Sequence, residues 1–168
     1  MSYTQAEIDE LISCQKTISD PPKRDLKPAG AHSRNDMRLV ASGLDGEFTA
    51  FMRRSIDFPE NFFIGLIYDP KNGTGEITLI RCNGLHGVFG GSFDPDHPHW
   101  GNHIHRATEA NIAAGLRPER HAVSTDAYAS FEEALQHFVK LINFSPAQAN
   151  EYFPSDAQST FPFQEGGN

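Results

Sequence analysis

Histidine is concentrated in one short segment of this 168-residue chain. Five of its eight histidines lie within residues 86–105, in a stretch that also contains two aspartates. Imidazole titrates near neutral pH and is the most common metal-ligating side chain in proteins. The segment therefore indicates where proton transfer or metal chemistry would take place.

The spacing of these residues favours acid–base chemistry. His103 and His105 are two positions apart in a predicted strand, so their side chains should leave the same face. Residues 76–83 form another predicted strand, whose odd-numbered positions run from apolar residues to Arg81 and Asn83, as expected for a core face that ends at a cleft. Two imidazoles and a guanidinium could supply the base, the acid and the anion-binding group that phosphodiester cleavage needs.

We therefore expect a site for phosphodiester cleavage that needs no metal or other cofactor. His103 and His105 would share the acid–base work, Arg81 would hold the scissile phosphate, and Asn83 and His86 would orient it. The alternative for the two strand histidines is an ordinary surface or hydrogen-bonded role. The predicted catalytic residues are His103, His105, Arg81 and, as a reserve base, Glu109, and the predicted substrate-binding residues are Asn83, His86, Arg106 and His121.

Two other functions would use the same segment. In the first, a divalent metal such as zinc supports hydrolysis, because His-x-His on a strand is a common ligand spacing. His97 and His99 flank a proline in a loop, and we expect them to be solvated rather than bound to metal. In the second, the loop recognises a protein without catalysis. The candidate metal ligands are Asp94, Asp96, His97, His99, His103 and His105.

Composition limits the partners of the chain. It carries 14 Lys and Arg against 22 Asp and Glu, a net charge of −8, which argues against a broadly basic surface that coats nucleic acid. Residues 47–125 contain seven basic and nine acidic residues, so a locally basic cleft is compatible with the sequence. Two cysteines are too few for a disulfide framework, and the sequence contains no secretory signal and no apolar run long enough to span a bilayer. We expect a cytoplasmic protein with no membrane partner.

The order of predicted elements indicates a single α+β domain over residues 1–144. Capping-box patterns begin a helix at Thr4 and another at Ser130. Between them, residues 62–69 and 76–83 flank a Gly-rich turn and form the clearest hairpin. The expected architecture is a curved antiparallel sheet of about four to six strands, with the N- and C-terminal helices packed on one face.

The two ends of the chain are expected to differ from this core. Residues 1–37 should comprise the N-terminal helix and, from residue 20, a connecting loop rich in proline and charge. Residues 145–168 are polar with isolated aromatics, and we expect a poorly ordered or partner-binding tail. Because the chain is itself acidic, a protein partner is expected to engage this tail rather than a charged surface.

A motif across the middle of the chain resembles known proteins. The pattern Arg81-x-Asn83-Gly84-x-His86, followed by His103-Ile-His105-Arg-Ala-Thr-Glu109 and an amphipathic helix, resembles a group of small uncharacterised bacterial proteins. It also distantly resembles the TumE-type toxins of toxin–antitoxin modules, which carry a Gly-Asp-His-x-His segment before a final helix. Here Asn102 replaces the aspartate. The second resemblance implies a growth-inhibiting, ribonuclease-like toxin that acts on RNA. It also implies an antitoxin, which we expect to engage residues 145–168.

Overall fold

The computed structural model describes residues 2–23, 25–86 and 98–154. In these ranges the chain has an α+β fold, as predicted, but its antiparallel sheet has eight strands, more than the four to six expected. The helices are α1 (Gln5–Ser13), α2 (Glu109–Ala113), α3 (Phe131–Leu141) and α4 (Pro146–Tyr152), with a short 3-10 helix η1 (Pro98–Trp100). The strands are β1 (Lys16–Asp20), β2 (Lys27–Ala29), β3 (His32–Ala41), β4 (Glu47–Ser55), β5 (Phe62–Asp69), β6 (Ile77–Asn83), β7 (His103–Arg106) and β8 (Ala122–Ser124).

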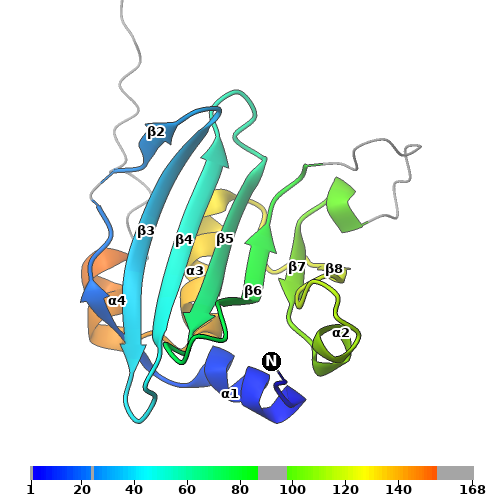
Figure 1. Ribbon diagram of the computed structural model, residues 1–168. Helices are drawn as coiled ribbons and strands as arrows, with labels where there is room; N and C mark the ends of the chain where they lie inside the picture. The colour runs from blue at the N-terminus through cyan, green and yellow to red at the C-terminus, as the bar shows by residue number, and fades with distance from the viewer. Residues whose placement is uncertain (1, 24, 87–97, 155–168) are drawn as a thin grey trace, which may run out of the picture.

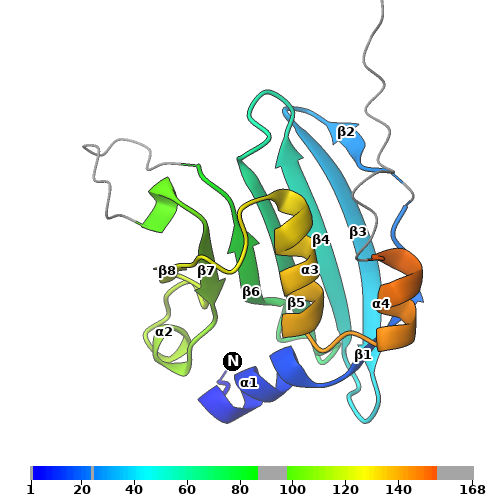
Figure 2. The same ribbon diagram turned by 180° about the vertical axis from the view of Figure 1, so that it is seen from behind.

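The sheet has one helical face and one open face. Its strands run in the order β1-β3-β4-β5-β6-β7-β8, and β2 also pairs with β3. Figure 1 looks onto the face without helices. Figure 2 shows the other face, which is covered by α3 and α4, while α1 lies across one end of the sheet. The predicted packing of helices on one face is therefore confirmed.

The apolar core lies between the sheet and this helical layer. Phe48, Ala50 and Met52 alternate along β4 and are buried, and α3 contributes Leu135 and Phe138 to the same core. Residues of the opposite parity on each strand point to the open face. The sheet therefore presents two separate sets of side chains, one that faces the core and one that faces the open side.

Both predicted helix starts are present in the structure. Thr4 and Glu7 form a complete capping box, and the Ser130 hydroxyl accepts a hydrogen bond from the Glu133 amide at 3.1 Å. Such caps satisfy amide groups that have no partner within the helix. Among the described residues, no helix combines the length and the apolarity needed to cross a membrane.

The prediction of a loop over residues 20–37 is wrong in its second half. Residues 27–29 form β2, and β3 begins at His32. The strand was hidden because its outward positions are charged, while Asn35, Met37 and Leu39 are buried in alternation. The Asn35 side chain forms two hydrogen bonds with the backbone of Lys23, at 3.0 and 2.7 Å, which hold the segment between β1 and β2 against β3.

The ordered domain also extends beyond residue 144. Pro146 begins α4, a position where the missing amide proton of proline costs nothing. The Gln148 side chain accepts a hydrogen bond from the Ile18 amide at 2.8 Å, and Gln136 donates one to the Phe153 carbonyl at 2.9 Å. Residues 146–153 are therefore folded against the rest of the domain, and residues 155–168 of the predicted tail lie outside the described residues.

A buried lysine joins the two longest helices. Lys16 is 0 % exposed, and its Nζ donates to the carbonyls of Ile12 at 2.9 Å, Cys14 at 2.8 Å and Ile142 at 3.2 Å. Ile12 is in the last turn of α1, and Ile142 caps α3. Carbonyls at helix C-termini carry partial negative charge and lack partners within the helix, so one ammonium group satisfies both ends.

A β-bulge in β6 separates the core side chains from those of the open face. Ile77 pairs with Tyr68 and Ile80 with Leu66, so the four residues 77–80 of β6 oppose the three residues 66–68 of β5. Ile77 and Ile80 consequently both point into the core, and Arg81 points to the open face. The prediction that the odd-numbered residues 77–83 share one face is therefore wrong.

Candidate metal centre

Four histidines bring their ring nitrogens together beside β6 and β7. One nitrogen from each lies within 4.8 Å of those of the others. Nε2 of His86 is 3.1 Å from Nε2 of His103, and ring centroids of neighbouring histidines are 4.7 to 5.4 Å apart. The strand pair His103 and His105 is buried, whereas His86 and His99 are partly buried.

The strand histidines are held in a fixed orientation by backbone carbonyls. Nδ1 of His103 is 2.8 Å from the Gly101 carbonyl oxygen, and Nδ1 of His105 is 3.0 Å from that of Glu119. Because a carbonyl only accepts hydrogen bonds, each Nδ1 carries a proton. In the neutral rings the lone pair is then on Nε2, which is the arrangement found in metal-binding histidines.

The other two histidines come from segments that flank the strand pair. His86 follows the end of β6, and His99 lies in η1. The His86 amide donates to the His99 carbonyl at 3.2 Å, which ties these segments together. Gly84 allows the chain to leave β6 here, since a Cβ at this position would collide with the Glu60 carbonyl oxygen and the Phe62 ring.

Arg81 lies beside the histidines and retains an unused donor. It is opposite His105 in the register of β6 and β7, and its side chain is 15 % exposed. Its Nε is buried and has no hydrogen-bond partner among the described residues, although it is ion-paired with Oε1 of Glu119 at 3.6 Å. Glu119 bonds Arg117 more closely, at 2.7 Å. Arg81 therefore places a guanidinium beside the histidines, with one N–H that no described residue accepts.

The buried Asn83 side chain and Tyr128 lie at the ends of β6 and β7, next to His103. Asn83 is opposite His103, is 2 % exposed, and has a buried Oδ1 with no hydrogen-bond partner among the described residues. The Tyr128 hydroxyl lies 2.7 Å from the His103 carbonyl oxygen and 3.1 Å from that of Asn83. Tyr128 therefore fixes the ends of β6 and β7, a role that the sequence analysis did not anticipate.

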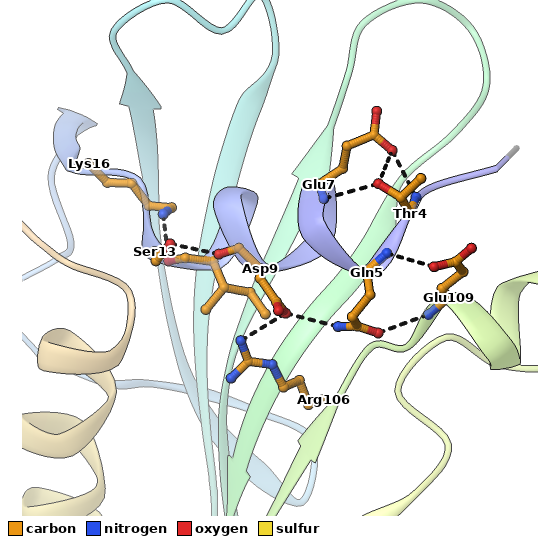
Figure 3. Close-up of polar contacts among 9 residues, drawn as sticks. Thr4, Gln5, Glu7, Asp9, Ser13, Lys16, Arg106 and Glu109 are labelled. Carbon is orange, nitrogen blue, oxygen red and sulfur yellow. Dashed lines mark hydrogen bonds and ion pairs between the residues drawn. The ribbon is translucent and has the colours of Figure 1, made fainter.

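Three predicted site residues lie apart from this cluster. Arg106 has the opposite parity to the strand histidines, and its side chain is 3.1 Å from Asp9 of α1. Glu109 exchanges hydrogen bonds with Gln5, as Figure 3 shows, so it joins α2 to α1. His121 is exposed just before β8 and is not one of the four converging histidines.

The structure also changes the set of site residues. His99, a candidate metal ligand that we expected to be solvated instead, is one of the four histidines, as is His86, which was not among the candidate metal ligands. The sequence analysis missed Glu119, which is 3 % exposed and contributes its carbonyl to His105 and its carboxylate to the two arginines. No local pattern marks Glu119, because its role depends on where a distant loop returns to the sheet. Asp94, Asp96 and His97 lie outside the described residues.

Burial makes the strand histidines difficult to protonate. Desolvation, reinforced by neighbouring positive charge, lowers the pKa of His103 to about 4 and that of His105 to about 3. Arg81 contributes to both shifts, and its own pKa falls to about 10 through burial. At neutral pH both imidazoles are thus neutral, with lone pairs available, while Arg81 stays charged.

These shifts predict how the stability of the metal-free protein depends on pH. The unfolded chain binds protons at these histidines near pH 6.5, whereas the folded chain does not until about pH 4. The free energy of unfolding should therefore fall by a few kcal/mol as pH decreases from about 7 to 4. Urea denaturation with a chelator present would measure this slope. It should flatten in a His103→Asn/His105→Asn variant but not in His121→Asn.

Comparison of the chain with known protein families, curated proteins and solved structures finds no match. The resemblance to TumE-type toxins therefore stays a prediction.

Proposed function

We propose that this protein is a metal-dependent hydrolase, with one divalent transition-metal ion such as zinc bound by His86, His99, His103 and His105. The observation that carries the proposal is the convergence of four imidazole nitrogens within 4.8 Å of one another. Three of these four histidines were predicted site residues: His103 and His105 as catalytic residues and His86 as a substrate-binding residue. The proposal thus keeps the predicted location of the chemistry and changes its type.

The donor set suits a metal of this kind. Imidazole nitrogens bind zinc at about 2.0–2.1 Å, so two of them on a tetrahedral ion lie about 3.3 Å apart. The nitrogens of His86 and His103 are already 3.1 Å apart. The remaining nitrogens need only a small contraction, because His86 and His99 are carried by segments outside the strands.

The surrounding residues are arranged for hydrolysis of an anionic substrate. With all four histidines as ligands, a divalent metal would need a fifth coordination position for a water molecule, which it would acidify to supply the nucleophile. The guanidinium of Arg81, whose Nε has no hydrogen-bond partner among the described residues, would bind the negative charge of the substrate. The buried Oδ1 of Asn83 would accept a hydrogen bond from the attacking water, because it is an acceptor without a partner among the described residues.

A ribonuclease that works without metal fits the geometry less well. The same face does carry two imidazoles and Arg81, as that mechanism requires. However, burial lowers the pKa of both His103 and His105 to 4 or below, so neither is protonated at pH 7. Such a mechanism needs a general acid as well as a base, and it would therefore be slow at neutral pH.

Metal content and chelation test the proposal directly. The purified protein should bind one equivalent of zinc, and cobalt substitution should give the visible absorption of a nitrogen-ligated tetrahedral or five-coordinate ion. Hydrolysis of bis-para-nitrophenyl phosphate should stop with a chelator and resume when zinc is restored. A protein that binds no metal would overturn the proposal. Cleavage of RNA that persists in the chelator would favour the metal-independent mechanism instead.

A further inference from the structure

The open face of the sheet leads directly to the histidine site. Opposite residues in an antiparallel pair point to the same face, so the strand register defines continuous rows of side chains across the sheet. Two such rows pass through His105 and His103. The first contains Asp36, Phe51, Gly65, Arg81, His105 and Ala122, and the second contains Arg34, Arg53, Phe63, Asn83, His103 and Ser124.

Both rows carry an aromatic ring on the open face. Phe51 and Phe63 are only partly buried, and their ring centroids are 6.2 Å apart in an edge-to-face arrangement. Gly65 lies between Phe51 and Arg81, and a Cβ there would collide with the Phe51 ring and come within 2.8 Å of Arg81 Cγ. The glycine therefore lets the ring and the arginine stem meet over β5. No helix covers these strands in Figure 1.

The charge of the rows differs from that of the whole chain. They contain three arginines and one aspartate, whereas the chain has a net charge of −8. Asp36 is paired with Arg53, and the Arg53 guanidinium also lies over the Phe51 ring, 5.8 Å from its centroid. Arg34 is exposed and forms no ion pair with any residue that the structure describes. Arg81 is paired with Glu119, so the open face combines aromatic rings with two paired arginines and one, Arg34, that has no ion pair in the described part of the chain.

We infer that this open face binds single-stranded nucleic acid and presents its backbone to the histidine site. Flat rings bind bases of any sequence by stacking, and arginines bind the phosphates between them. Phe51 is three strands from His105, about 14 Å at the usual strand spacing, which a short oligonucleotide spans. The inference rests on the proposed hydrolytic site and specifies its substrate as a phosphodiester within a single strand.

Binding of labelled oligonucleotides tests this platform separately from the metal. Fluorescein-labelled octamers of uridine and of deoxythymidine would be titrated with metal-free protein, so that no cleavage occurs. Phe51→Leu and Phe63→Leu should each weaken binding about tenfold. Arg34→Gln should weaken it and reduce the salt dependence by about one counterion. The matched controls are Phe58→Leu, which is exposed outside the rows, and Arg38→Gln, which lies on the same strand but is paired with Glu47.

The outcomes separate the two proposals. Variants that lose oligonucleotide binding but still take up one equivalent of zinc support the platform, and preferential binding of one octamer identifies RNA or DNA as its ligand. Row variants that bind like the wild type, or a zinc-loaded wild type that binds neither octamer, overturn the platform and leave the metal centre intact. Oligonucleotide binding by a chain that takes up no zinc supports the platform and overturns the metal centre.

Discussion

Replacing His103 by alanine is expected to abolish stoichiometric metal binding. Its Nε2 lies closest to another ring nitrogen of the cluster, and its Nδ1 is already bonded to the Gly101 carbonyl. Loss of residues that merely orient a ligand costs 10–100-fold in metal affinity, so loss of this ligand should cost more than about 100-fold. Competition with a chromophoric chelator would measure the affinity. Hydrolysis should be lost in parallel.

His121→Ala is the matched control for this variant. His121 lies in the same part of the chain and was a predicted site residue, but it is exposed and outside the cluster. Its removal should leave the metal affinity unchanged. Equal metal affinity of the His103→Ala and wild-type proteins would show that the cluster is not a metal centre, provided that the variant retains the wild-type far-ultraviolet circular dichroism.

Replacing Lys16 by alanine is expected to destabilise the fold by about 3–5 kcal/mol. The change removes three hydrogen bonds from an ammonium group to buried carbonyls and leaves a cavity beside Phe48, whose ring centroid is 4.8 Å from Nζ. A loss of this size is a large part of the stability of a typical domain. Urea denaturation would measure it.

Two further variants separate the causes of this loss. Lys16→Met keeps most of the side-chain volume but leaves the carbonyls of Ile12 and Ile142 without a donor, so it should recover only part of the stability. Lys27→Ala changes an exposed lysine of β2 and should have an effect within about 0.5 kcal/mol. Similar values for the Lys16 and Lys27 alanine variants would contradict the bridging role of Lys16.

The sequence was most informative where local chemistry decides the structure. The Ser130 cap and the apolar repeat of α3, together with the glycines of positive φ in the β5–β6 turn, mark elements that form from nearby residues. β3 was largely missed because its charged outward positions masked a buried alternation. The bulge in β6 was missed as well, since one extra residue leaves no trace in composition.

The candidate site was predictable only in part for a related reason. The alternation within β7 places His103 and His105 together, and it also excludes Arg106, whose position one residue later reverses its direction. His99 and Glu119 come from segments that return to the sheet by non-local contacts. Their backbone carbonyls bond His86 and His105, each more than ten residues away, where the periodicity of a strand or helix carries no information.

The bulge in β6 makes the direction of its side chains depend on the exact number of residues between Ile77 and Arg81. Ile77 and Arg81 serve opposite faces only because one unpaired residue lies between them. Deleting or inserting a single residue in this interval would turn the guanidinium into the hydrophobic interior and bring a core side chain out beside the histidines. Changes of length in the turn before Ile77 have no such effect. We therefore expect insertions and deletions to be tolerated in that turn but not between Ile77 and Arg81.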